Sequence, residues 1–417
     1  MSGPQSDEGY GDNVRIDMIS EHASPLAALG GADAGGQNVH VAALATALAR
    51  RGHEVTVFTR RDSPQPPDAV PFAPGVTVRP VPAGPSRPLP KDDLLGYMPA
   101  FANWLAARWR EQPPDVAHAH FWMSGMAAIW ATASIPDPVP VVETFHALGS
   151  VKRRWQAEAD TSPPQRLGLE ATVARQASAI IATCTDEVSE LTAYGARPET
   201  MYVVPCGVDC GRFRPGPDAG ADPPRSPARV LSLGRLVPRK GNDTVITAIA
   251  GVPGTELIIA GGPDPGQLHR DPEVARLSRV AEACGVADRV RFTGRVPHEH
   301  GPALLRSADI VVSVPWYEPF GIVPVEAMAC GKAVVVSAVG GHLDTVEDGT
   351  TGRLVPPRDP AALTAALTQL LAEPGLRREL GTAGAARAAA RYSWDKIAAE
   401  TEAVYACVRQ EQGVGTR

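Results

Sequence analysis

Short runs of β-branched and other apolar residues recur along the chain, separated by longer segments in which apolar residues return every three or four positions. This alternation predicts parallel βαβ units with helices on both faces of each sheet. The expected strands of the first half are residues 14–20, 54–59, 76–81, 116–118, 139–144, 179–182 and 201–204. Those of the second half are residues 230–233, 257–260, 290–293, 310–314 and 333–337. Helical periodicity is clearest over residues 36–51, 93–110, 361–371, 376–391 and 394–409.

A proline-rich segment divides the chain into two such sets. Residues 211–227 contain five prolines and no apolar period, which is typical of a connection between domains. We expect a first Rossmann-like domain over residues 1–210, a linker over 211–228, a second domain over 229–391 and a helical segment over 392–417. The predicted fold class is α/β, with two doubly wound domains facing a cleft at the carboxyl ends of their strands, where such folds bind ligands.

Composition narrows the classes of function. The 417 residues carry a net charge of −6, and the longest basic run is Lys152-Arg153-Arg154, so we expect no nucleic-acid partner. No stretch approaches 18 consecutive apolar residues, and residues 1–12 are rich in glycine and acidic groups, so we expect a cytoplasmic protein without membrane insertion. Six scattered cysteines lack the close pairs or histidine partners of a zinc site. We therefore predict no metal and no cofactor, and leave a homodimer open.

The first strand is followed by a glycine-rich segment, Gly30-Gly31-Ala32-Asp33-Ala34-Gly35-Gly36-Gln37-Asn38, which leads into a helix. Glycines at a strand-to-helix turn let the backbone approach a ligand, and a helix start offers free N–H groups to an anion. The segment is consistent with a phosphate-binding loop, and equally with an ordinary turn. A dinucleotide fingerprint would follow the strand directly, whereas residues 21–29 intervene here, which disfavours a nicotinamide dehydrogenase.

The second domain carries the most informative stretch, from Val314 to Gly331. It leaves an expected strand, turns at Pro319-Phe320-Gly321 and enters a helix, so the backbone donors of residues 321–323 should face the cleft. Glu318 and Glu326 flank this turn, where paired carboxylates can bind sugar hydroxyls.

Two cations and three histidines complete the candidate chemistry. Arg235 and Lys240 follow the first strand of the second domain, near a helix start, where they could stabilise a diphosphate leaving group without a metal. His118, His120 and His146 each lie near a strand end. A single buried histidine is usually a hydrogen-bonded core residue, so these positions alone do not define a site.

Together these residues resemble a known family. The stretch from Glu318 to Glu326, EPFGIVPVE, resembles the EPFGxxxxE motif of the family 4 retaining glycosyltransferases, which have the two-domain GT-B fold. The GR235xxxxK240G motif, the glycine-rich loop and the TFH146ALG segment are also similar, so the resemblance covers nearly the whole chain. Within the family the motifs are most similar to those of the mycothiol-pathway glycosyltransferases and the sucrose-phosphate synthases.

The resemblance implies a role for each matching residue of the donor site. Glu318 would hold hydroxyls of the donor sugar, Glu326 the donor ribose, and Arg235 and Lys240 the diphosphate. His146 would contact the sugar near the reacting carbon. The remaining donor contacts would come from glycines of the first domain and from the turn of the second, namely Gly35, Gly36, Phe320, Gly321, Ile322 and Val323. The family's C-terminal helix returns to the first domain, which suits residues 394–409.

The acceptor site is implied less closely. Asn38, Lys91, Phe121 and Arg166 fall at its positions. Phe121 and Ala147 stand where the mycothiol-pathway enzymes have a tyrosine and a threonine, so two hydroxyl contacts to an acceptor phosphate are missing. The retained cations favour a carboxylate- or phosphate-bearing acceptor other than inositol phosphate, and a neutral sugar or cyclitol is the alternative.

The sequence thus predicts a retaining glycosyltransferase that moves a hexose from a nucleoside diphosphate sugar, a UDP-sugar by resemblance, to a small hydroxylated acceptor. Retention follows from the family alone. A nucleotide-sugar-binding protein without turnover, a GT-B epimerase and a phosphorylase are the alternatives, because a fold does not guarantee one activity.

Overall fold

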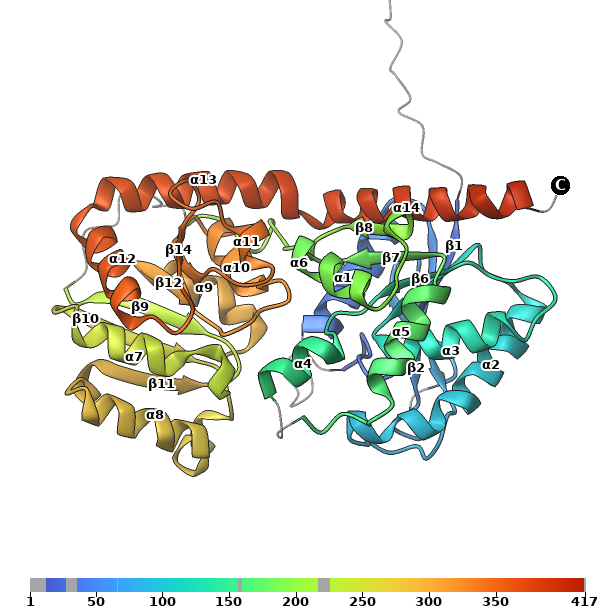
Figure 1. The fold of residues 1–417 in the computed structure, drawn as a ribbon, viewed down its shortest axis with the longest axis horizontal. Coiled ribbons are helices and arrows are strands. Elements are labelled where there is room, and N and C mark those ends of the chain that lie inside the picture. The colour runs from blue at the N-terminus through green and yellow to red at the C-terminus, as the bar shows by residue number, and fades with distance from the viewer. Residues whose placement is uncertain (1–12, 28–35, 66, 157–159, 217–225, 416–417) are drawn as a thin grey trace, which may run out of the picture.

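The computed structural model contains two α/β domains, and one long helical path runs along both of them (Figure 1). The structure describes residues 13–27, 36–65, 67–156, 160–216 and 226–415. Each domain is built on one mainly parallel sheet with helices on both faces.

The sheet of the first domain has eight strands in the order β3-β4-β2-β1-β5-β6-β7-β8. Neighbours are parallel except for the antiparallel edge pair β3 and β4. The strands are β1 (Arg15–Ile19), β2 (Glu54–Arg60), β3 (Val70–Ala73), β4 (Val76–Val81), β5 (Val116–His120), β6 (Val141–Thr144), β7 (Ala179–Ala182) and β8 (Met201–Val203). Central strands such as β5 and β6 are buried along their whole length, as expected for a sheet covered on both faces.

Helices of the first domain pack against these strands. They are α1 (Gly36–Arg50), α2 (Met98–Glu111), α3 (Trp122–Thr132), α4 (Gly149–Gln156), α5 (Arg166–Gln176) and α6 (Thr185–Ala193). One core cluster joins α2, α3 and α5 to the sheet, and a second joins α1 to its other face.

The sheet of the second domain has six parallel strands in the order β11-β10-β9-β12-β13-β14. These are β9 (Ala228–Leu233), β10 (Thr255–Ala260), β11 (Val290–Gly294), β12 (Ile310–Ser313), β13 (Ala333–Ser337) and β14 (Arg353–Val355). Its helices are α7 (Asn242–Ala250), α8 (Pro272–Ala283), α9 (Gly301–Arg306), α10 (Ile322–Ala329), α11 (His342–Thr345), α12 (Pro360–Ala372) and α13 (Pro374–Tyr392).

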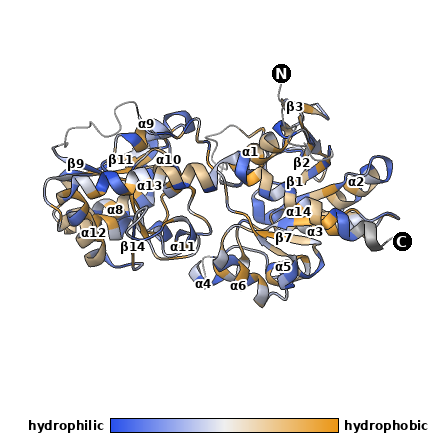
Figure 2. Ribbon diagram, turned by 90° about the horizontal axis from the view of Figure 1, so that it is seen from above, coloured by the Kyte–Doolittle hydropathy of each residue, from blue (hydrophilic) through white to orange (hydrophobic). Residues whose placement is uncertain are grey.

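The last helix, α14 (Trp394–Gly415), lies on the first domain (Figure 2). Ile397, Val404, Tyr405 and Val408 are buried in the core cluster that also contains Leu44 of α1. The chain therefore crosses between the domains twice, after β8 and after α13.

The two crossings lie side by side. Val208 N–H donates to the Tyr392 carbonyl at 2.7 Å. A Cβ atom at Gly207 would lie 2.4 Å from Trp394 Cδ2, so only glycine lets the two segments come this close. The predicted boundaries at 210 and 228 stay predictions, although Cys206 and Val208 already pack with the core of the second domain.

No described helix is long and apolar enough to span a lipid bilayer.

Candidate active site

The two domains bring two helix N-termini face to face. Gly36 begins α1, and a Cβ atom added there would lie 3.3 Å from Cδ1 of Ile322, which begins α10. Gly321 caps α10 with a φ of 89°, a conformation that favours glycine. Because the first N–H groups of a helix have no partner within it, both helices direct donors and positive dipole ends toward this space. A diphosphate suits such a space. Gly35 lies outside the described residues.

Positive side chains adjoin these N-termini in the second domain. Lys240 closes a short 3₁₀ turn (Pro238–Lys240), and its Nζ forms an ion pair with Glu318 Oε2. Gly241 follows with a φ of 71°, and a Cβ atom there would lie 2.2 Å from the carbonyl oxygen of Val314. Glycine thus allows the Lys240 turn to approach the loop after β12. Arg235 is exposed on the loop after β9, and its side chain forms no hydrogen bond or ion pair with the described residues.

Glu318 is ionised in this setting. Burial acts to raise the pKa of its carboxyl, but the charges of Lys240 and Arg239 and the hydrogen bond from Lys240 hold the pKa below its usual value. The carboxylate is therefore an acceptor for hydroxyl groups at neutral pH.

His342 lies directly beneath the Gly321 turn. Its Nδ1 is 3.0 Å from the Ser337 carbonyl oxygen, and its buried Nε2 has no hydrogen-bond partner in the part of the chain that the structure describes. A Cβ atom at Gly321 would lie 2.7 Å from that Nε2. Burial lowers the pKa of His342 to about 4, so the ring is neutral and supports the turn without adding charge.

Glu326 lies on α10, one turn past its start. Burial raises the pKa of its carboxyl to about 8, with Arg212 opposing the shift. Its carboxyl group forms no hydrogen bond or ion pair with the described residues, so the carboxyl oxygens are available to ligand hydroxyls. Phe320, by contrast, packs its ring 5.9 Å from Tyr392 in the domain core, which leaves only its backbone for a ligand. Val323 is half-buried against the same core.

Three histidines gather where α1, β5 and the loop after β6 meet. His120 Nδ1 and His146 Nε2 are hydrogen-bonded at 3.0 Å, and the His40 ring lies 4.9 Å from the His146 ring. Burial lowers the pKa of each imidazole, His40 to about 4, so all three are neutral at neutral pH. His146 has a positive φ of 59° and is the half-buried member of the group. It is the member that a ligand in the cleft can reach.

His118 belongs to the structural core instead. Its Nδ1 is 2.7 Å from the Tyr405 hydroxyl of α14, and its Nε2 is 2.9 Å from Thr144 Oγ1. Both ring nitrogens are thus used, and the residue fixes α14 to the sheet.

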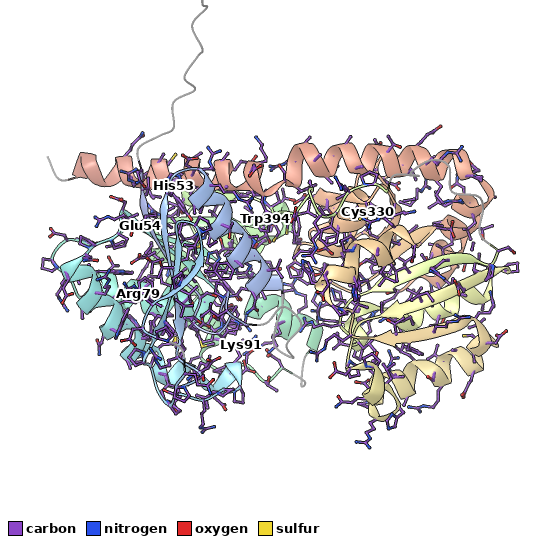
Figure 3. The ribbon with its side chains drawn as sticks, turned by 180° about the vertical axis from the view of Figure 1, so that it is seen from behind. His53, Glu54, Arg79, Lys91, Cys330 and Trp394 are labelled. Atoms are coloured by element: carbon purple, nitrogen blue, oxygen red, sulfur yellow. The ribbon has the colours of Figure 1, made fainter. Side chains whose placement is uncertain are left out.

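A third group lies deeper in the first domain, around the ring of Phe121. Lys91 Nζ is 4.9 Å from the ring centroid, and the Arg166 guanidinium carbon is 5.3 Å from it. Figure 3 shows Lys91 on the side of the first domain that faces the second. The pKa of Lys91 is lowered by burial and by the charge of Arg166, and its ammonium forms no ion pair with the described residues.

Arg166 is far less available than Lys91. Its Nε donates to Glu170 at 2.7 Å, one terminal nitrogen to Ser162 at 3.1 Å and the other to the Ala147 carbonyl at 2.7 Å. The residue is 2 % exposed, so its role is to position the Ala147 loop. Its positive charge still acts on the group around Phe121, although its guanidinium is not open to a ligand. Asn38 is also buried, and its amide donates to the Ser24 carbonyl at 3.0 Å.

The chain matches known proteins along most of its length. Residues 34–212 match the family model described as Glycosyltransferase Family 4, and residues 220–387 match that described as Glycosyl transferases group 1. D-inositol 3-phosphate glycosyltransferase of Acidothermus cellulolyticus is 40% identical over 408 residues, covering 94% of this chain and 90% of that protein. The chain belongs to the family 4 glycosyltransferases of GT-B fold.

Solved structures agree with this assignment. Sucrose-phosphate synthase from Thermosynechococcus elongatus has a TM-score of 0.84 and 32% identity, covering 95% of this chain and 99% of that one. The Anabaena protein HepE, solved in complex with UDP and glucose, has a TM-score of 0.73 and 21% identity, covering 94% and 100% of the two chains. At 21% identity, the similarity to HepE is evidence for the fold alone.

The glycosyltransferase brings together most residues singled out from its sequence. Gly36, Ile322, Lys240 and Glu318 meet at the domain interface, and Lys91, Phe121 and Arg166 form the second group. His342 and His40 were missed. His342 follows a Gly-Gly pair that could have drawn attention, whereas nothing near His40 in the sequence predicts that its ring meets His146.

Proposed function

We propose that this glycosyltransferase moves a hexose from a UDP-sugar to a small anionic hydroxylated acceptor, with retention at the anomeric carbon and without a metal. The meeting of the α1 and α10 N-termini beside Lys240 carries the proposal, because it is suited to a diphosphate held between domains. The glycine-rich loop and the EPFG turn of the family fall at these two N-termini.

The donor would lie along α10. The diphosphate would contact the Gly36 and Ile322 amides together with Arg235 and Lys240, which supply the charge that a divalent cation provides in other transferases. Glu326 would accept from the ribose hydroxyls and Glu318 from the sugar. The sugar would then project toward His146, whose half-buried ring can bond a hydroxyl near the reacting carbon.

Retention suits a front-face substitution. The bond from the anomeric carbon to the diphosphate oxygen breaks as the acceptor oxygen bonds to the same face of that carbon. The acceptor's proton passes to the departing diphosphate oxygen. Lys240 and the helix N-termini stabilise the charge that develops on the leaving group. Glu318 is already paired with Lys240, which favours a binding role over that of a nucleophile.

Lys91 supports an anionic acceptor. Its ammonium lies over Phe121, has no carboxylate partner among the described residues, and adjoins the buried charge of Arg166. The relatives named above act, by their names, on inositol 3-phosphate or form sucrose phosphate. Phe121 and Ala147 make the pocket more apolar, so an anion with fewer polar contacts than inositol phosphate fits it.

The test is a matrix of donors and acceptors. UDP-glucose, UDP-N-acetylglucosamine and their ADP and GDP counterparts are assayed with inositol 3-phosphate, fructose 6-phosphate, hydroxy acids, free inositol and fructose. We expect turnover with a UDP-sugar and an anionic acceptor, unchanged by EDTA, and a product whose anomeric configuration by NMR matches the donor. Turnover with neutral acceptors alone, unaffected by Lys91→Ala, would contradict the acceptor proposal. Loss of turnover in EDTA, restored by Mg²⁺ or Mn²⁺, would contradict the metal-free mechanism.

A further inference from the structure

The histidine cluster has a geometry that sugar binding by His146 does not require. One ring nitrogen from each of His40, His120 and His146 lies within 4.8 Å of the other two. His40 and His120 are 4 % and 0 % exposed, while His146 is half-buried. His40 Nδ1 and His120 Nε2 are buried and have no hydrogen-bond partner among the described residues.

Burying an imidazole nitrogen without a partner is unfavourable, because the nitrogen loses its hydrogen bond to water and gains none in return. A single packed histidine avoids this penalty, as His118 does with two partners. His40 is instead held between the rings of Trp394, at 5.3 Å, and His146, at 4.9 Å, with its polar edge unused. These contacts from α14 and from the loop after β6 fix the ring's position in the absence of a hydrogen bond.

We propose that His40, His120 and His146 form a binding site for a borderline divalent cation such as Zn²⁺ or Co²⁺, distinct from the metal-free chemistry proposed above. Three neutral imidazoles with one open side are the ligand set of open zinc sites, in which each nitrogen lies about 2.0–2.1 Å from the metal. The nitrogens of His120 and His146 lie 3.0 Å apart, slightly closer than two ligands of a tetrahedral zinc ion, and all three ligand nitrogens lie within 4.8 Å of one another. Metal binding therefore requires the rings to shift so that all three nitrogens reach one point.

The chemistry of the cluster selects the cation. No carboxylate is among the three ligands, so hard cations such as Mg²⁺ and Ca²⁺ are disfavoured, whereas imidazole suits zinc, cobalt, nickel and copper. One of His120 and His146 carries the N–H proton of the hydrogen bond between them. When the metal binds, that proton moves to the other nitrogen of the same ring. Both rings therefore stay neutral, and both facing nitrogens are free to bind the metal.

A bound cation would occupy a ring nitrogen of His146, the half-buried member of the cluster. If His146 contacts the donor sugar, Zn²⁺ therefore inhibits turnover in competition with the UDP-sugar, and EDTA reverses the inhibition. This consequence rests on the proposed function, whereas binding of the cation does not.

The experiment titrates the full chain, free of any histidine tag, with Co²⁺ and follows visible d–d absorption. We expect an intense spectrum of low coordination number at one equivalent, displaced by Zn²⁺. His40→Phe keeps the aromatic packing against Trp394 and should weaken Co²⁺ binding by about 10- to 100-fold or more, at least the effect of losing an outer-shell partner. His300→Gln is the matched control, because it removes an exposed histidine from the turn 298–300 and should leave the titration unchanged.

A second readout needs no variant. X-ray absorption at the zinc edge of the wild-type protein loaded with one equivalent should report three imidazoles. One imidazole or none, or a Co²⁺ titration equal in wild type and folded His40→Phe, overturns the proposal. Tight binding by three imidazoles without competition against the UDP-sugar upholds the site and instead rejects the role proposed for His146.

Discussion

Lys240 and Arg235, which we propose contact the same diphosphate, differ in their surroundings. Lys240 is paired with Glu318, whereas the Arg235 side chain has no ion pair with the described residues. Replacing either by alanine should lower kcat by roughly 10²-fold or more, the usual effect of removing one transition-state contact. Steady-state kinetics with saturating donor measure this. Both variants should melt near the wild-type temperature, and a variant with normal turnover would remove that residue from the leaving-group site.

Glu318 and Glu326 should separate turnover from nucleotide binding. Above about pH 8, where the Glu326 carboxyl is ionised, Glu326→Gln should weaken UDP binding, because a neutral amide accepts ribose hydroxyl bonds less strongly than a carboxylate. Glu318→Gln should depress kcat more than UDP affinity, because its proposed partner is the sugar. Calorimetry with UDP, paired with kinetics, distinguishes the two, and equal weakening of UDP by both substitutions would show the roles to be wrong.

The buried carboxyl of Glu326 should also make stability depend on pH. In the folded chain its pKa is about 8, compared with an ordinary value of 4.5. Between these values the folded state binds more protons than the unfolded state, so the free energy of unfolding falls as pH rises from about 4.5 to 8. Glu326→Gln removes this titration. As pH rises across this window, the free energy of unfolding of the variant, measured with urea, should therefore increase relative to that of wild type. Glu299→Gln, an exposed control, should follow wild type at every pH.

The sequence alone predicted those polar residues of the candidate site that lie next to a recognisable turn, such as Glu318 and Lys240. The sequence did not predict that His40 and His342 also lie there. Both acquire their environment from segments distant in sequence, His40 from β5, the loop after β6 and α14, and His342 from the turn at Gly321. The availability of Arg166 was also beyond the sequence, because its bonds to Glu170, Ser162 and Ala147 exist only in the folded chain.

At the level of elements, α14 is held by a buried hydrogen bond as well as by apolar packing. Tyr405→Phe would leave His118 Nδ1 without its partner at 2.7 Å and should lower the free energy of unfolding by about 1–3 kcal/mol. Urea unfolding measures the change. Tyr97→Phe is the control, since the Tyr97 hydroxyl has no hydrogen bond to the described residues and its loss should change stability by less than about 0.5 kcal/mol.

The same elements show how far sequence patterns reach. Buried strands such as β7 and β13 were predicted with their observed limits, because continuous apolar runs are typical of a doubly covered parallel sheet. The edge strands β3 and β14 were missed. β3 has a proline and no buried residue, and β14 is three residues long, so neither carries the pattern of a buried strand. The predicted helix at 93–110 begins later, at Met98, because residues 91–97 form two 3₁₀ turns.

Across the whole molecule, the domains also meet through a side chain of one that caps a helix of the other. Asp344 accepts from the Thr185 backbone N–H at 2.6 Å and from its hydroxyl at 2.8 Å, at the start of α6. Asp344→Ala should favour domain separation, raising the radius of gyration measured by small-angle scattering and raising KM for the donor. Asp348→Ala, within a loop of the second domain, should change neither. An unaltered scattering curve for Asp344→Ala would show that this contact does not hold the domains together.

The return of α14 has a consequence for the order in which the protein can fold during synthesis. Tyr405 and its neighbours complete the core beneath α1, yet they leave the ribosome about 200 residues after β8. At about 5–20 residues per second, the first domain waits roughly 10–40 s with the apolar face of α1 uncovered. The second domain is complete by Tyr392 and needs no such delay. The domain made first should thus be the last to reach its native state, and the more dependent on a chaperone while it waits.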